Sequence, residues 1–204
     1  MTTVVPFKAR GLRAELQRAF EDRAPVRILR ERIQPGVIHG YVIGLSRDFC
    51  LVAEVGDAIR FDGYLAIAIA DVTSLDVDPA REFVEKALAL RGEALVVPEG
   101  FRLEDWAAIA RSAATLAPVI SVNMIEDDEG EISYVGQIVE TDAHGVVLRE
   151  LDPNAAWYPD TGSYEYEAIG SIGFGSGYLD ALWQVAGSPS GPMTPRVPAS
   201  DTVH

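Results

Sequence analysis

The chain has few of the residues on which catalytic and metal sites most often depend. It contains one cysteine, Cys50, and three histidines, His39, His144 and His204, each isolated in the sequence. A single cysteine cannot form an internal disulfide, and the histidines have no spacing typical of a zinc site. We therefore expect a cytoplasmic protein without a bound metal or other cofactor.

Long apolar runs are also missing. The longest spans residues 64–70, whereas a membrane helix needs about 20 apolar residues. The N-terminus lacks the charged start and apolar stretch of a secretory signal. Apolar residues still make up 48% of the 204 residues, which is enough for a hydrophobic core. These features predict a folded protein of one large or two small domains that does not enter a membrane.

Basic residues are scarce, with 17 against 31 acidic residues and a net charge of −14. An acidic body repels phosphate backbones, so the composition argues against broad nucleic-acid binding. Residues 8–32 are the exception, with eight basic and four acidic residues. If the protein binds RNA, we expect the contacts in this segment. The candidate contact residues are Arg13, Arg18, Arg27 and Arg30, for which a solvated helix face is the simpler interpretation.

Short strand-like segments separated by turn residues dominate the sequence. The first series consists of a helix over 9–23, strands over 26–33, 37–45, 49–55, 64–70 and 72–77, and a helix that begins at Asp78-Pro79 and ends at Gly92. The second series consists of a helix over 103–116, strands over 119–125, 132–140, 146–151 and 164–174, and a helix over 177–186.

The two series indicate an internal repeat of residues 9–92 and 103–187. The aligned pairs are Gly40 with Gly136, Glu54 with Glu150, Tyr64 with Tyr164 and Ile69 with Ile169. Glycines inside strands are typical of the bulges and bends that a small barrel needs at its corners. The run 64–70 has isoleucine and leucine on one face and alanine on the other, so it is expected to be covered on both sides. We expect the two units to pack face to face through it.

A helix followed by about five short strands resembles the Sm-like family of SH3-like small barrels. The segment VIHGYVIGLSRDFCLVAEV, residues 37–55, is similar to that family's first motif: a strand with an internal glycine, a turn and an apolar strand. The resemblance covers about 55 residues of each copy. It implies a small barrel in each copy and, since Sm-like barrels assemble through edge strands, self-association.

The sequence departs from the RNA-binding members of that family. Those members carry an Asp and an Asn in the turn of the first motif and an Arg-Gly or similar pair between the last two strands. The corresponding residues here are Ser46-Arg47-Asp48 and Ala70-Asp71-Val72 in the first copy, and Thr141-Asp142-Ala143 and Gly170-Ser171-Ile172 in the second. The family's RNA site therefore cannot be transferred to this chain.

The expected fold is mainly β with flanking helices (α+β), built from two tandem Sm-like or SH3-like small barrels, each with a helix before and after. The expected organisation is a first unit over 1–92, a connector over 93–102, a second unit over 103–187 and a disordered proline-rich tail over 188–204.

Three groups of residues could form a catalytic, phosphate-binding or metal site. Cys50 and His39 lie in neighbouring predicted strands, with Asp48 nearby, and could form a nucleophile and base, although a strand cysteine is more often a small core residue. Gly173, Gly175 and Gly177 lie where a phosphate-binding loop would lie, but their spacing fits no known fingerprint. The acidic segment Glu126, Asp127, Asp128, Glu129 and Glu131 lacks the ligand spacing of a calcium loop and is expected to be a solvated hairpin tip. No catalytic, metal or cofactor residues are assigned.

Trp157 and Tyr158 lie in a predicted long loop between Pro153 and Pro159. Aromatic residues on a loop can anchor a partner, or they can fold down over the second barrel. The sequence therefore favours a non-catalytic, cytoplasmic interaction or regulatory module that binds a protein or a second copy through barrel edges. Two alternatives stay open: an RNA-binding module that uses the basic N-terminal helix, and a small enzyme at Cys50 and His39.

Overall fold

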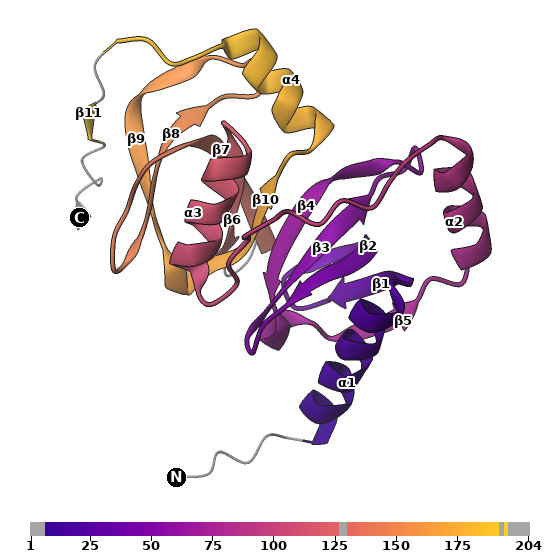
Figure 1. Ribbon diagram of the computed structural model, residues 1–204. Helices are drawn as coiled ribbons and strands as arrows, with labels where there is room; N and C mark the ends of the chain where they lie inside the picture. The colour runs from indigo at the N-terminus through magenta and orange to yellow at the C-terminus, as the bar shows by residue number, and fades with distance from the viewer. Residues whose placement is uncertain (1–6, 127–129, 192–193, 196–204) are drawn as a thin grey trace.

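The computed structural model describes residues 7–126, 130–191 and 194–195 (Figure 1). This part of the chain is mainly β, as the sequence predicts, with four α-helices and ten strands in one open antiparallel sheet. A two-residue strand, β11 (Thr194–Pro195), adds a parallel pair at one edge. None of the described helices is long and apolar enough to cross a membrane.

The elements fall into two series along the chain. The first contains α1 (Phe7–Asp22), β1 (Pro25–Arg30), β2 (Gln34–Leu45), β3 (Phe49–Val55), β4 (Phe61–Ala68), the 3-10 turn η1 (Ile69–Asp71), β5 (Ser74–Val77) and α2 (Arg81–Leu90). The second contains α3 (Trp106–Leu116), β6 (Ile120–Glu126), β7 (Gly130–Thr141), β8 (Gly145–Leu151), β9 (Trp157–Glu165), the 3-10 turn η2 (Tyr166–Ala168), β10 (Ile169–Phe174) and α4 (Gly177–Ala186).

The two halves of the sheet have the same strand order. The first half runs β4-β3-β2-β1-β5 and the second runs β9-β8-β7-β6-β10. The register places Gly40 opposite Glu54 in one half and Gly136 opposite Glu150 in the other. The irregularity between Val42 and Gly44 in β2 also has its counterpart between residues 138 and 140 of β7. Strand order, the register of these ladders and this irregularity therefore correspond between the two halves.

The alignment of the later strands differs from the one expected from sequence. Tyr64 lies opposite Ala53, and the matching ladder position in the second half is Thr161, which lies opposite Arg149. Tyr164 is therefore not the counterpart of Tyr64. The segment 164–174 is not one strand either, because η2 divides it into the end of β9 and the whole of β10. Likewise η1 ends β4 at Ala68, two residues before the predicted end.

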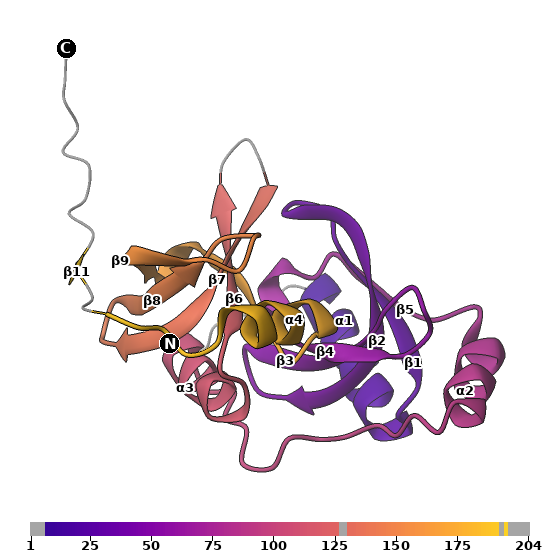
Figure 2. The same ribbon diagram turned by 90° about the horizontal axis from the view of Figure 1, so that it is seen from above.

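The halves join edge to edge and not face to face. β4 of the first half pairs antiparallel with β10 of the second, from Tyr64 opposite Phe174 to Ile67 opposite Ser171. β10 also pairs with β6, and all six of its residues are buried. The alanine-rich run thus joins the halves through main-chain pairing. Figure 2 shows the β6–β7 hairpin projecting beside the first half.

Three hydrophobic clusters fill the molecule. One is formed in the first half by α1 and the β1–β4 strands, and includes Leu16, Val26 and Cys50. The largest lies under α3 and includes residues of both halves, among them Leu51 and Ile172. A small cluster lies under α4. The core is therefore shared across the junction of the halves.

The connector and the tail both contact the body of the protein. Glu93 accepts hydrogen bonds from Arg60 (2.9 Å) and from the Phe61 N–H (3.3 Å), and Tyr64 donates to the Val96 carbonyl (3.2 Å). Within the segment expected to be disordered, residues 194–195 pair with β9. The remainder of that tail after residue 191 lies outside the described residues.

Candidate functional site

A polar cavity of about 320 Å³ lies at the junction of the two halves. Strands β2, β3 and β4 of the first half and β6, β7, β10 and α4 of the second half line it. The polar lining residues are Glu54, Tyr64, Ser121, Asn123, Glu131, Ser133, Ser171 and Ser176. The apolar lining residues are Val37, Ile38, Leu65, Phe174 and Leu179. This volume lies at the small end of the range typical of ligand sites.

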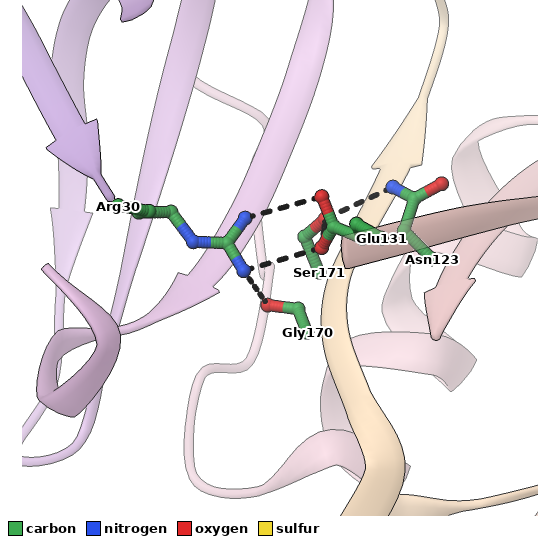
Figure 3. Close-up of polar contacts among 5 residues, drawn as sticks. All are labelled: Arg30, Asn123, Glu131, Gly170 and Ser171. Atoms are coloured by element: carbon green, nitrogen blue, oxygen red, sulfur yellow. Dashed lines mark hydrogen bonds and ion pairs between the residues drawn. The ribbon is translucent and has the colours of Figure 1, made fainter. Parts of the chain in front are cut away.

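A buried ion pair lies beside the cavity, which its carboxylate member, Glu131, lines (Figure 3). The Arg30 side chain is 1% exposed and that of Glu131 is 8% exposed. Arg30 donates to both Glu131 carboxylate oxygens, at 3.2 and 3.5 Å, and to the Gly170 carbonyl at 2.8 Å. Ser171 donates to Glu131 (2.7 Å) and accepts a hydrogen bond from the Asn123 amide (2.9 Å). Arg30 of the first half is thus held by two strands of the second, β7 and β10, and Asn123 of β6 supports this network through Ser171.

Gly170 makes this approach possible. A Cβ at position 170 would lie about 2.5 Å from Glu131 Oε1 and 3.1 Å from an Arg30 guanidinium nitrogen. Because a bidentate pair fixes the relative position of both side chains, the network holds the first half against the second. Removing one partner of such a pair costs about 3–5 kcal/mol, since the other charge is left buried and unpaired.

Glu54 is the second carboxylate of the cavity and has no hydrogen-bond partner among the described residues. Desolvation, together with the negative charges of Asp62 and Glu131, raises its pKa to about 7. Burial in a medium of low dielectric constant disfavours the ionised form of an acid. Near neutral pH this side chain is therefore present in both its protonated and its ionised form.

A second, more apolar cavity of about 230 Å³ lies beside α2. At this cavity the His39 Nδ1 lies 3.1 Å from a carboxylate oxygen of Asp78. The other Asp78 oxygen accepts the Ala80 N–H at 2.8 Å, which orients this carboxylate at the start of α2. Helix α2 begins at Arg81 with Ala80 as its N-cap, so Asp78 does not start the helix as the sequence predicts, and its contact with His39 was not indicated by the sequence.

The structure does not bring Cys50 and His39 together. In the β2–β3 ladder Cys50 lies opposite Leu45, six residues from His39 along β2. Cys50 is fully buried, and desolvation raises the pKa of its thiol to about 12. Because the thiolate is the reactive form, this cysteine has the character of a core residue and not of a nucleophile.

The four candidate arginines have different environments. Arg30 is buried in the ion pair, and Arg13 donates to the Arg47 and Ser46 carbonyls at 2.6 and 2.8 Å. Arg27 is partly buried, and its Nε has no hydrogen-bond partner in the part of the chain that the structure describes. Of these four, Arg18 alone belongs to the exposed residues. They therefore do not form a continuous basic surface, which weakens the RNA-binding hypothesis.

Trp157 and Tyr158 are not in an open loop, because they begin β9. The Trp157 indole N–H donates to the Gly187 carbonyl at 3.1 Å, and its ring lies 6.4 Å from that of Trp183 in an edge-on arrangement. Trp157 thus folds down onto α4, which is the second of the two arrangements considered for it. Tyr158 is 47% exposed and remains available to a partner.

The two remaining sequence candidates also have internal partners. The start of α4 is occupied, since Ser176 accepts the Leu179 N–H and the Gly177 N–H donates to Asp62 at 2.7 Å. A carboxylate of the protein therefore fills the position that a bound phosphate would take. In the acidic segment, Glu131 is not solvated as expected but pairs with Arg30, while residues 127–129 lie outside the described residues.

The sequence reasoning missed the cavity, although one signal pointed to it. Arg30 continues the buried face of Val26 and Ile28, because residues two apart in a strand share a face. An arginine on an apolar face requires a buried anion nearby. The polar residues Ser121 and Asn123 alternate in the same way along β6, but nothing in the sequence shows that these two strands meet.

Within the described ranges, no cluster of three or more histidine, cysteine, aspartate or glutamate side chains could hold a metal ion. Comparisons of the chain with models of known protein families, with curated proteins and with solved structures gave no match.

Proposed function

We propose that the protein is a non-catalytic, cytoplasmic interaction module made of two Sm-like halves, and that it self-associates through its sheet edges. Each half has a helix followed by five strands, and the glycine-containing strand β2 has its counterpart in β7. The cytoplasmic location is proposed because the single cysteine, which is buried in the first half, cannot form an internal disulfide.

The joint between the halves is the observation that carries this proposal. It pairs the fourth strand of one half with the fifth strand of the other. The matching strands at the two ends of the sheet are β9, a fourth strand, and β5, a fifth strand. Transferring the register of the joint predicts that residues 161–164 of one molecule pair with residues 74–77 of another. An exposed strand edge is a ready template for such pairing.

The β5 edge has the character of an association surface. Among the described strands, β5 pairs only with β1. Val77 at its end is 53% exposed, and Phe83 on the following helix is 63% exposed. At the other edge of the sheet, β11 pairs with β9 at residues 160–161. The tail therefore covers one end, residue 161, of the β9 segment 161–164 that the proposed contact uses.

Val77 offers a selective test of this contact. The Asp78 N–H donates to the Pro25 carbonyl at 2.8 Å. Because successive N–H groups of a strand point to opposite sides, the Val77 N–H points away from β1. Val77→Pro therefore removes one outward donor and leaves the β1–β5 ladder intact, whereas Val77→Thr keeps the donor.

Light scattering during size exclusion, over a range of concentrations, measures the outcome. We expect the wild type and Val77→Thr to exceed the monomer mass of 22.1 kDa as concentration rises, and Val77→Pro to remain monomeric. A wild-type protein that stays monomeric throughout would contradict the proposal. Binding to mixed RNA oligonucleotides that weakens steeply with salt would favour the RNA-binding alternative instead.

A further inference from the structure

The residues that line the junction cavity offer hydrogen-bond acceptors, and none of them carries a positive charge. No lysine, arginine or histidine is among the residues that line it. Arg30 reaches the wall from outside, and its charge is taken up by Glu131. The free charge in the cavity is therefore that of Glu54, which makes the site unfavourable for an anion and favourable for a cation.

Neutral hydrogen-bond acceptors line the same cavity as this carboxylate. The Asn123 amide nitrogen donates to Ser171, and Figure 3 shows its oxygen pointing away from that contact. No hydrogen bond within the described ranges uses this oxygen or the hydroxyls of Ser121 and Ser133. A ligand with several N–H donors could satisfy these groups together with Glu54.

The remaining walls are apolar. The cavity is also lined by Val37, Ile38, Leu65, Phe174 and Leu179. Phe174 stacks on Tyr64 with ring centroids 5.0 Å apart, so its ring is held in place. Such walls suit methylene groups, and the aromatic ring adds favourable contact with a cation.

We propose that this cavity binds a small aliphatic ammonium compound, with one ammonium group against Glu54 and its methylene chain along the apolar walls. The ammonium replaces the water that Glu54 loses on burial, and its remaining N–H groups reach the neutral oxygens. A bare divalent metal ion is a poorer fit, because one of the two carboxylates is already held by Arg30.

The charged groups around Glu54 make binding pH-dependent. Asp62 of β4 and Glu131 of β7 face it with negative charge, and Arg30 of β1 offsets Glu131. Protonation of Glu54 removes the charge that holds the ammonium group, while the aliphatic amine stays protonated at and below pH 8. The affinity should therefore rise as the pH increases through about 7.

Isothermal titration with 1,4-diaminobutane at pH 8 in 150 mM sodium chloride tests the proposal. We expect saturable binding with one site per chain, at least tenfold weaker in Glu54→Gln and at least tenfold weaker at pH 5.5. The matched control is Glu140→Gln, which removes the same charge from an exposed residue and should bind as the wild type does.

Two comparison ligands separate this site from general attraction to an acidic protein. We expect 1,4-butanediol, which has the same length and no charge, and magnesium chloride not to compete with the diamine. Equal binding by wild type and Glu54→Gln, absence of saturable binding, or displacement by either comparison ligand would each overturn the proposal. Thermal unfolding of Glu54→Gln establishes that the variant is folded, and the outcome is independent of self-association.

Discussion

At the scale of single residues, the junction contains two charged side chains in different environments, Arg30 and Glu54. Arg30 is buried with a bidentate partner and a carbonyl acceptor, so its desolvation is offset by three hydrogen bonds. The Glu54 side chain is half-buried without a hydrogen-bond partner among the described residues, and desolvation is the main cause of its raised pKa. A charge that opposes folding and lies in a cavity is typical of a binding site, where the ligand supplies the missing partner.

The uncompensated charge of Glu54 predicts that Glu54→Gln stabilises the protein at alkaline pH. With a pKa near 7 in the folded state and 4.5 as its ordinary value, the folded state binds the more protons between these two pH values. Wild-type stability from this group therefore falls as pH rises from 4.5 to 7, and stays low above 7. The variant should gain at most about 3 kcal/mol at pH 8 and nothing below pH 4.5.

Urea unfolding at several pH values measures this difference. Glu140→Gln is again the control, because an exposed carboxylate should give a difference that changes little with pH. A constant difference between Glu54→Gln and the wild type, or a loss of stability at pH 8, would show that Glu54 is already compensated within the protein.

At the scale of elements, a glycine in the second strand of each half allows the backbone of the third strand to approach closely. A Cβ at Gly40 would collide with the Ala53 carbonyl, and one at Gly136 would collide with the Arg149 carbonyl. Each glycine lies opposite a glutamate, Glu54 or Glu150. The identical arrangement explains why a glycine stands at the same place in two strands that otherwise differ in sequence.

This arrangement predicts that Gly40→Ala and Gly136→Ala each destabilise the protein by about 1–3 kcal/mol, because the neighbouring backbone has to move. Gly11→Ala is the internal control, since it lies in α1 with no atom within 4 Å of its would-be Cβ. Alanine there should stabilise the protein by up to about 1 kcal/mol. Thermal unfolding of the three variants measures the contrast, and equal effects at all three positions would argue against it.

The sequence predicts the type and bounds of an element well where turn or capping residues mark its ends. β3 and α4 have the predicted bounds, because turn residues flank the first and Ser176 caps the second. The breaks at η1 and η2 were missed, since neither of these turns contains a glycine or proline. The cavity could not be predicted, because it depends on β4 meeting β10, and edge pairing leaves no periodic signal in either strand.

At the scale of the whole molecule, the two halves share their interior. The largest core cluster includes Leu51 and Ala66 from the first half and Ile120 and Ile172 from the second. The β4–β10 pairing and the Arg30–Glu131 ion pair also cross the junction. Separating the halves would expose apolar surface and leave a buried charge unpaired, so neither half is expected to be stable alone.

A shared interior predicts that the two halves unfold together. The chain provides a natural probe for each half, because Trp106, Trp157 and Trp183 all lie in the second half and the single thiol, Cys50, lies in the first. In a urea titration, tryptophan fluorescence and the labelling of Cys50 should report the same midpoint, since Cys50 is fully buried until the first half opens. Labelling of Cys50 at a clearly lower urea concentration would show that the first half opens while the second stays folded. In that case the junction, and with it the cavity, would be a contact between two independent units, and a ligand bound there should bring the two midpoints together.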